Sequence, residues 1–168
     1  MPERDNLLKT KIKHYNNYFD FKETYKTLFD YLLDQGWDMN EKAYKEVLQA
    51  GGAKEIEVEW ECIRKVSDYF KFWMKIKFHP MGMTNVEVEI DGVKQKMNKG
   101  SMDIEVEIAL IKDYEDRWGN KPFFKFLRTL YDRYLIRDRV ERYEERLIQE
   151  MDEFVNQAKA YLAMTGRR

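Results

Sequence analysis

The chain has little of what metal centres, nucleophilic sites and disulfide scaffolds are built from. It contains one cysteine, two histidines and three prolines in 168 residues. A single cysteine excludes an intrachain disulfide and is typical of a reducing compartment. The histidines, His14 and His79, lie far apart and belong to no metal-ligand spacing. The sequence therefore predicts no metal site and no cofactor, and an enzyme is the least supported class of function.

Net charge and long apolar runs are also lacking. The chain carries 30 basic and 31 acidic side chains, a formal net charge of −1, so no overall field attracts nucleic acid or an anionic membrane. No apolar run approaches the length of a bilayer span, and the first 18 residues lack the apolar core of a signal peptide. We therefore expect a cytoplasmic protein with no membrane partner.

Alternation of apolar and charged residues dominates the segment 54–111. Successive side chains of a strand point to opposite faces, so each alternating run predicts a half-buried strand. The charged positions switch sign from run to run: acidic in 56–62, basic in 70–78, acidic in 86–90, basic in 93–97 and acidic in 102–108. Neighbouring strands of opposite charge stabilise each other. The five runs therefore predict an antiparallel meander in chain order.

Asp91 and Gly92 predict a two-residue hairpin turn, because both positions of such a turn need positive φ. This turn places Glu89 opposite Lys94 and Glu87 opposite Lys96. We expect a four-residue loop at 98–101 to follow, which would set Lys96 beside Asp103 and Lys94 beside Glu105.

The first hairpin of the meander needs a different turn. A two-residue loop at 67–68 would put glutamates on the apolar face, since a slip of one residue exchanges the two faces of a strand. We therefore predict a loop of odd length or a bulge between Arg64 and Phe70. Such a loop would pair Glu59 with Lys75 and Glu57 with Lys77.

The segment before the sheet divides into an arm and a helical region. Residues 1–19 form a basic and aromatic arm. This arm can bind a partner or an RNA backbone, or it can form a short strand or a coil packed on the core. Asp20 is a helix cap, and the apolar spacing after it predicts a helix at about 21–35. Asn40 predicts the start of a second, short helix that ends before Gly51, so that 20–52 is helical.

Residues 120–164 predict long C-terminal helices, with Asn120 as the first cap. One apolar series consists of Phe123, Phe124, Leu127, Leu130, Tyr131 and Tyr134, and a second, nearly heptad series starts at Ile136. The two series are out of phase near 135–138, which predicts a bend, a break or a change of packing partner. The expected fold is one α+β domain, 1–168, whose five-stranded antiparallel meander has two N-terminal helices and long C-terminal helices on its apolar face.

Six residues are candidate partner contacts. Trp73 falls on the charged face of its strand, where it either meets a partner or is covered by the arm. Arg117 and Trp118 belong to a dense polar and aromatic loop that begins at Asp113. The six candidates are Trp73, His79, Arg117, Trp118, Arg137 and Arg142.

Three functions remain open. The leading one is a non-enzymatic interaction module that self-associates, as a homo-oligomer, through a seam on the last helix formed by Val140, Leu147, Met151, Phe154 and Tyr161. The second is an RNA- or ribosome-associated accessory protein that uses the basic arm and the arginine-rich helix. The third is a small-molecule binder similar in plan to helix-grip domains, with a pocket lined by Trp60, Phe72, Met74 and Phe124.

Overall fold

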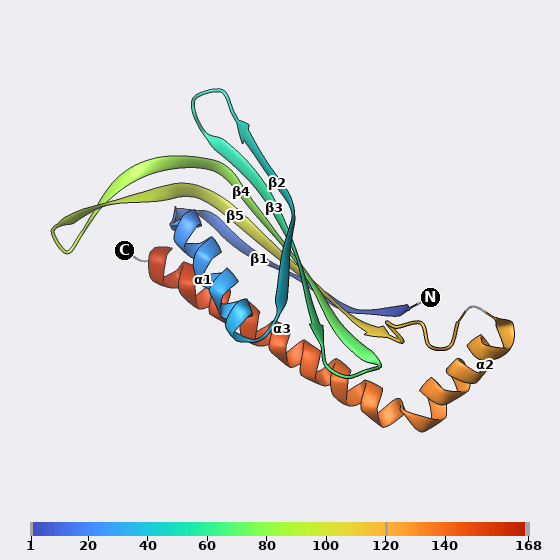
Figure 1. Cartoon of the computed structure of the whole chain (residues 1–168). Coiled ribbons are helices and arrows are strands. Elements are labelled where there is room, and N and C mark those ends of the chain that lie inside the picture. Colours follow the sequence, from blue (N-terminus) through green and yellow to red (C-terminus); the bar gives the residue numbers. More distant parts are fainter. Residues whose placement is uncertain (1, 120, 167–168) are drawn as a thin grey trace.

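The computed structural model describes residues 2–119 and 121–166. Its elements, labelled in Figure 1, are β1 (Glu3–Phe19), α1 (Phe21–Asp34), β2 (Asp38–Leu48), β3 (Lys54–Lys65), β4 (Phe70–Ile90), β5 (Val93–Lys112), α2 (Pro122–Leu130), a π-helical turn η1 (Tyr131–Leu135) and α3 (Arg137–Gly166). The strands form one antiparallel sheet in the order β1-β5-β4-β3-β2. The α+β class and the five-stranded antiparallel sheet are as predicted.

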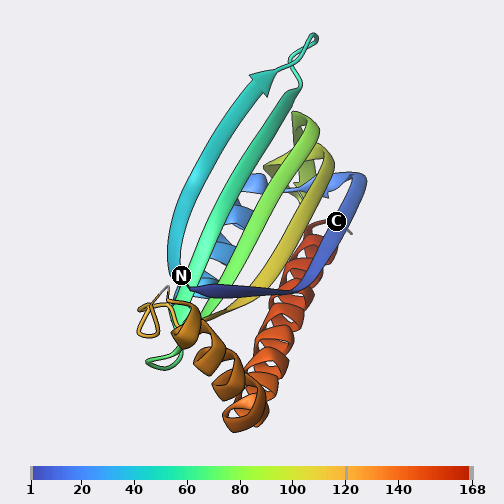
Figure 2. The same ribbon diagram turned by 90° about the vertical axis from the view of Figure 1, so that its right-hand side faces the viewer.

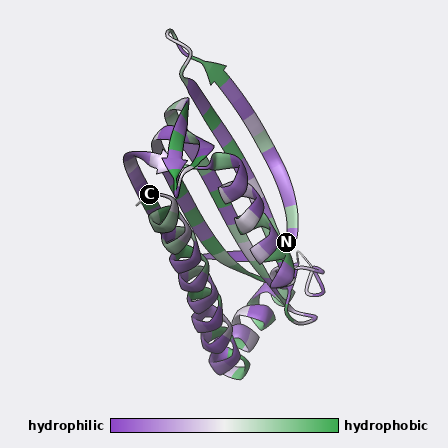
Figure 3. Ribbon diagram, turned by 90° about the vertical axis from the view of Figure 1, so that its left-hand side faces the viewer, coloured by the Kyte–Doolittle hydropathy of each residue, from purple (hydrophilic) through white to green (hydrophobic). Residues whose placement is uncertain are grey.

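Helices α1 and α3 lie on the same face of this sheet (Figures 1 and 2). The long C-terminal helix was predicted on this face and buries one side there, from Leu147 to Leu162. Tyr25 and Phe29 of α1 pack edge-on against Trp60 of β3. The outward side of α3 is mostly hydrophilic (Figure 3). The core therefore lies between one sheet face and two helices, and the opposite sheet face carries the charges.

The charge pattern fixes the register as expected at the Asp91-Gly92 turn. Glu89 pairs with Lys94, and Glu87 pairs with Lys96. In the first hairpin Glu59 lies opposite Lys77 in the strand register, two residues from the predicted pairing. Its carboxylate still reaches the ammonium of Lys75, at 3.2 Å.

Two segments that join predicted strands are themselves part of strands, so the five strands of the sheet are not the five predicted ones. The loop expected at 98–101 lies inside β5, and residues 79–85, which join the predicted strands 70–78 and 86–90, lie inside β4. Four predicted strands are therefore two long ones. An irregularity of register between Met81 and Thr84 accommodates Pro80 in β4. Gly100 permits the close approach there, since a Cβ at this position would lie 2.8 Å from the carbonyl oxygen of Met81. The predicted contacts of Lys96 with Asp103 and of Lys94 with Glu105 are therefore wrong.

The second predicted N-terminal helix is also wrong: residues 38–48 form β2, an edge strand. Glu, Lys and Ala favour a helix locally, but pairing with β3 supplies the backbone hydrogen bonds. Ion pairs reinforce that pairing, at 2.8 Å between Lys42 and Glu61 and at 2.7 Å between Lys54 and Glu46. The first predicted helix, at 21–35, is confirmed as α1, and the Asp20 side chain accepts from the amide of Glu23.

The N-terminal arm is the other edge strand, β1, and it runs beside β5. The lysines of the arm pair with the carboxylates that were expected beside Lys94 and Lys96. Lys9 lies 2.9 Å from Glu105, and Lys11 lies 2.8 Å from Asp103. In the part of the sheet that contains these pairs the alternation of charge crosses all five strands, from Lys9 and Lys11 of β1 through β5, Lys75 of β4 and Glu59 and Glu61 of β3 to Lys42 of β2. Toward the Asp91-Gly92 turn the signs are reversed, with glutamates on β4 and lysines on β5.

The C-terminal helical region breaks where the apolar series lose phase. The π turn ends at Ile136, whose φ of −120° and ψ of 9° interrupt the helix before α3 begins. The predicted cap at Asn120 lies outside the described residues. Contrary to the prediction, α2 does not pack on the apolar sheet face; it lies beyond the β3–β4 turn, at an angle to α3 (Figure 1).

Cys62 provides a direct test of the core. It is fully buried, and burial raises the pKa of its thiol to about 12. Because only the thiolate reacts, we expect the native protein to resist a thiol reagent at pH 8 and to react promptly once unfolded in denaturant. Absorbance of the released chromophore measures this, and rapid labelling of the native state would contradict the packing of β3.

Candidate functional site

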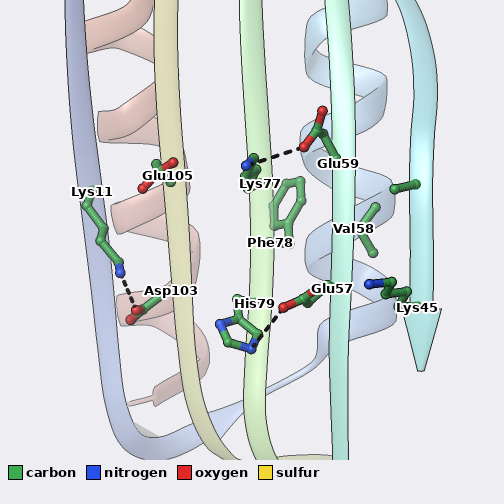
Figure 4. A pocket seen from close by; sticks show the side chains of 11 residues that line it. Lys11, Lys45, Glu57, Val58, Glu59, Lys77, Phe78, His79, Asp103 and Glu105 are labelled. Atoms are coloured by element: carbon green, nitrogen blue, oxygen red, sulfur yellow. Dashed lines mark ion pairs between the residues drawn. The ribbon is translucent and has the colours of Figure 1, made fainter. Parts of the chain in front are cut away.

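One hollow lies on the charged face of the sheet, away from the helices. It encloses about 430 Å³ and is lined by side chains from all five strands, including Lys11, Lys77, His79, Glu59 and Asp103 (Figure 4). His79, a predicted partner contact, lies here with its Nε2 atom 2.6 Å from Oε1 of Glu55.

The charges of this hollow neutralise one another. Lys11 pairs with Asp103, and Lys77 lies 3.4 Å from Glu59. Hydrogen bonds from His79 and Gln49 lower the pKa of Glu55 and hold it ionised. A charged ligand would have to displace these partners, so the hollow is poorly suited to bind one.

Trp73 is covered on the same face and is not free to meet a partner. The side chain is 4 % exposed, and its Nε1–H donates to Glu61 at 2.9 Å. The guanidinium carbon of Arg4, in the N-terminal arm, lies 3.5 Å from the ring centroid, a cation–π distance. Hydrogen bonds from Lys42 and Trp73 lower the pKa of Glu61. Of the two interpretations of Trp73, the structure favours coverage by the arm.

The seam predicted on α3 faces the core of the same chain. Leu147 and Phe154 are 0 % exposed, and Met151 is 1 % exposed. Val140 and Tyr161, at the two ends of the seam, are half-buried. Three of the five side chains are thus already packed against the protein's own core, and we do not propose an interface between copies through them.

Helix α2 presents most of its apolar side chains to solvent and buries the side chain of Arg128. Phe123, Leu127, Leu130 and Tyr134 align on one side of the helix at spacings of four and three residues. We call the apolar residues of this region the α2 surface: Phe123, Phe124, Phe126, Leu127, Leu130, Tyr134 and Leu135. The side chains of Phe123, Phe126 and Leu135 are 65 %, 60 % and 74 % exposed. Arg128, on the opposite side, is the one buried residue of α2.

Arg128 holds α2 in place through carboxylates from three parts of the chain. Its guanidinium lies 2.9 Å from Glu3 of β1, 3.6 Å from Asp113 after β5 and 3.8 Å from Asp132 of η1. The side chain of Asp113 is completely buried. Tyr69, in the β3–β4 turn, donates its hydroxyl to Asp132 at 2.8 Å. These contacts join the start of β1, the end of β5 and the β3–β4 turn to α2 and η1.

The titration of this cluster reflects burial and crowded carboxylates. Burial raises the pKa of Asp132, against the hydrogen bond from Tyr69. Burial, and then the bond to Asp132, raise the pKa of Tyr69. Burial opposes the charged form of Lys112, but its hydrogen bond with Asp5 and the surrounding carboxylates leave its pKa raised. The cluster is thus a structural anchor in which the ammonium of Lys112 remains charged.

A shallow apolar hollow adjoins the α2 surface. It encloses about 360 Å³ between Trp118 and the side chains of Leu127, Leu130, Tyr131, Tyr134 and Leu135. The Trp118 ring lies 5.6 Å from that of Tyr131. A hollow with this lining suits an apolar or aromatic side chain from a binding partner.

The remaining predicted contacts lie around this end of the molecule. Arg117 is exposed and pairs with Glu115 at 2.7 Å, and Arg137 pairs with Glu141 at 3.0 Å. Arg142 lines a separate cleft at the start of α3, and Trp118 lines the apolar hollow. The structure thus brings Arg117, Trp118, Arg137 and Arg142 to one end, whereas Trp73 and His79 lie on the charged sheet face.

The apolar series of α2 predicted burial on the sheet, but most of these side chains are exposed. The sequence pattern did not indicate this exposure. It also gave no role to Arg128, whose partners stand far away in the chain. The signal present in the sequence was the excess of positive charge: residues 121–139 contain six basic and two acidic side chains, in a chain whose net charge is −1.

The four side chains expected to line a helix-grip pocket do not meet. Trp60, Phe72 and Met74 are completely buried in the core, whereas Phe124 is on α2 and partly exposed. Within the described residues, no group of histidine, cysteine and carboxylate side chains is arranged to hold a metal ion. In residues 2–119 and 121–166, no helix has the length and apolarity that crossing a bilayer requires.

Comparisons with protein-family models, curated proteins and solved structures gave no match to this chain.

Proposed function

We propose that this protein is a non-enzymatic interaction module that binds a protein partner through the α2 surface. One observation carries the proposal: α2 is anchored by a buried arginine and directs its large apolar side chains outward. Contiguous apolar surface of this kind is uncommon on isolated domains and typically marks an interaction site.

The chemistry of the partner follows from what surrounds the α2 surface. Lys125 and Arg133 are exposed beside it, and the segment 121–139 carries a net charge of +4. A second copy of this chain would bring like charges together, which costs free energy in an interface. A partner with an apolar anchor residue and an acidic rim is complementary in both respects.

The hollow beside Trp118 favours a protein over a lipid surface. A side chain from a protein can fill a hollow of about 360 Å³, as anchor residues do at the centre of many interfaces. The basic arm offers RNA little, because Lys9 and Lys11 are paired with carboxylates of β5.

A photo-crosslinking amino acid at position 126 tests the proposal in cells. We expect it to form one dominant adduct with a different protein, and the same amino acid at Leu48 to form none. Leu48 is a matched control because it is exposed and apolar and is the last residue of β2, whose end lies far from α2 (Figure 1). Adducts with a second copy, or with lipid, would contradict the proposal.

Binding of the purified partner then gives the energetic test. Phe126→Asp with Leu130→Asp should weaken the complex at least about 30-fold, because charge is placed at the centre of an apolar interface. Val47→Asp with Leu48→Asp should leave affinity unchanged. Isothermal titration calorimetry measures both, and equal affinities for the two variants would overturn the assignment of the surface.

A further inference from the structure

A second cleft lies beside the α2 surface, where the β3–β4 turn meets η1 and the start of α3. It encloses about 370 Å³, within the usual size range of small-molecule sites. We call it the arginine cleft; the residues that line it are Ser67, Tyr69, Phe70, Tyr131, Ile136, Arg139, Arg142, Tyr143 and Arg146. None of these residues carries a carboxylate.

The three arginines give the cleft an excess of positive charge. Positions 139, 142 and 146 follow one side of α3 at spacings of three and four residues. Arg146 lies 3.1 Å from Glu150, but that carboxylate also binds Arg64 of β3. Among the described residues, Arg139 and Arg142 have no carboxylate within ion-pair distance. Arg142 donates Nε–H to the carbonyl of Asp138 at 3.1 Å, which leaves its terminal nitrogens to donate elsewhere.

The rest of the lining consists of a hydroxyl donor and aromatic rings. Ser67 Oγ accepts the amides of Tyr69 and Phe70, at 3.2 and 2.9 Å, so its own proton is available for another acceptor. The Tyr143 ring lies 4.8 Å from Phe70, and the Tyr69 ring lies 6.0 Å from Tyr131. Donors and rings thus surround the hollow with few competing acceptors.

We propose that the arginine cleft binds a phosphorylated small molecule whose body is aromatic or apolar. Guanidinium groups match the geometry of phosphate oxygens and bind them through paired hydrogen bonds. The hydroxyl of Ser67 adds a neutral donor, and the rings of Tyr69, Tyr131 and Tyr143 contact the body of the ligand. This site shares Tyr131 with the apolar hollow beside Trp118, but the proposal does not rest on the proposed protein partner.

The shape of the positive region favours a small ligand over RNA. A nucleic-acid strand is bound along an extended basic track, with one phosphate after another. Here Arg139, Arg142 and Arg146 line a single hollow. Beyond it Arg137 is paired with Glu141, and Lys9 and Lys11 are paired on the sheet.

Titration of the isotope-labelled protein with phenyl phosphate at low ionic strength tests the proposal. We expect saturable NMR shifts at residues of the cleft and a Kd of about 1 mM, reasonable for so small a ligand. Inorganic phosphate should bind more weakly, because it lacks the ring, and benzyl alcohol should not bind, because it lacks the charge.

Variants of exposed arginines separate specific recognition from general charge. Arg139→Gln and Arg142→Gln should each weaken phenyl phosphate about tenfold, through loss of a charge-assisted pair of hydrogen bonds. Arg142→Lys keeps the positive charge but lacks the forked donors of a guanidinium. Its Kd for phenyl phosphate should therefore lie between those of the unmodified protein and of Arg142→Gln. Arg137→Gln is the matched control, since Arg137 lies on the same helix outside the cleft, and its Kd should not change. Circular dichroism checks that all four remain folded.

Two outcomes would overturn the proposal: no saturable shift with phenyl phosphate well above its expected Kd, or equal effects of Arg142→Gln and Arg137→Gln. Vesicles of phosphatidylcholine with phosphatidic acid identify the source of the phosphate. Retention on them that is lost in the Arg139→Gln, Arg142→Gln double variant would assign a lipid headgroup, and binding of phenyl phosphate alone would assign a free metabolite. Tighter retention of a single-stranded RNA oligonucleotide by the same arginines would replace the small molecule with RNA.

Discussion

The double substitution Leu147→Glu with Phe154→Glu is expected to unfold the protein. Both side chains are completely buried beneath α3, and the Phe154 ring lies 6.3 Å from Tyr31 of α1. Loss of each apolar side chain costs roughly 3–5 kcal/mol, and an unpaired carboxylate in the same place costs several kcal/mol more. The sum is as large as most of the free energies of unfolding typical of a domain of this size, about 5–15 kcal/mol.

Far-ultraviolet circular dichroism and size-exclusion chromatography measure this effect. The variant should lose cooperative thermal unfolding and elute as an expanded or aggregated chain. Met164→Glu, on the same helix at an exposed position, should remain folded and is the control. A double variant that is folded but has changed from dimer to monomer would instead restore the seam as an interface between copies.

Arg128→Met is expected to release α2 and to destabilise the whole chain. The substitution keeps the length of the side chain but leaves Glu3, Asp113 and Asp132 without the guanidinium they share. Breaking a buried ion pair from one side costs roughly 3–5 kcal/mol. We expect about 3 kcal/mol, at the lower end of that range, because the loop 113–119 can rearrange to hydrate Asp113.

Urea denaturation measures the change in the free energy of unfolding of the whole chain, and hydrogen exchange shows which residues are destabilised. Exchange should accelerate most over 113–136, because Arg128 is the one side chain of α2 that is buried. Arg133→Met, an exposed arginine five residues away, should change the free energy of unfolding by less than about 0.5 kcal/mol. Adding Asp113→Asn to Arg128→Met should recover part of the loss; a further loss would show that Asp113 is held by other groups.

The parts of the fold that sequence analysis predicted correctly depend on neighbouring residues. The Asp91-Gly92 turn sets the pairing of Glu89 with Lys94 locally, and Asp20 caps α1 three residues away. Alternation of sign correctly indicated that 56–62 lies beside 70–78 and that 86–90 lies beside 93–97. The same alternation wrongly made neighbours of 70–78 and 86–90 and of 93–97 and 102–108, which are continuous within β4 and β5. It did not identify the arm as the strand beside β5, because residues 9 and 11 meet Glu105 and Asp103 only after the intervening chain has folded.

The orientation of α2 could not be predicted from periodicity alone. The apolar series defines one side of a helix, and an apolar side is normally buried. Here the partners of Arg128 decide the orientation: Glu3 stands 125 residues earlier in the chain. The same limit applies to the arginine cleft, of whose lining only Arg142 was singled out, since Ser67 and Tyr69 reach it from another part of the sequence.

The pairing of β1 with β5 has a consequence for the way the chain is made. Glu3 pairs with Lys112, so β1 is synthesised before β2 to β5 and must wait for β5, its partner. At translation rates of about 5–20 residues per second, that delay is on the order of 5–20 s. The three hairpin-linked strands β3, β4 and β5 can associate early through short loops, whereas closure by β1 bears a larger entropic cost. We infer that nascent chains pass through a state in which the edge of β5 that later pairs with β1 is open. A chaperone would bind at this edge, and a chain terminated prematurely would remain incompletely paired.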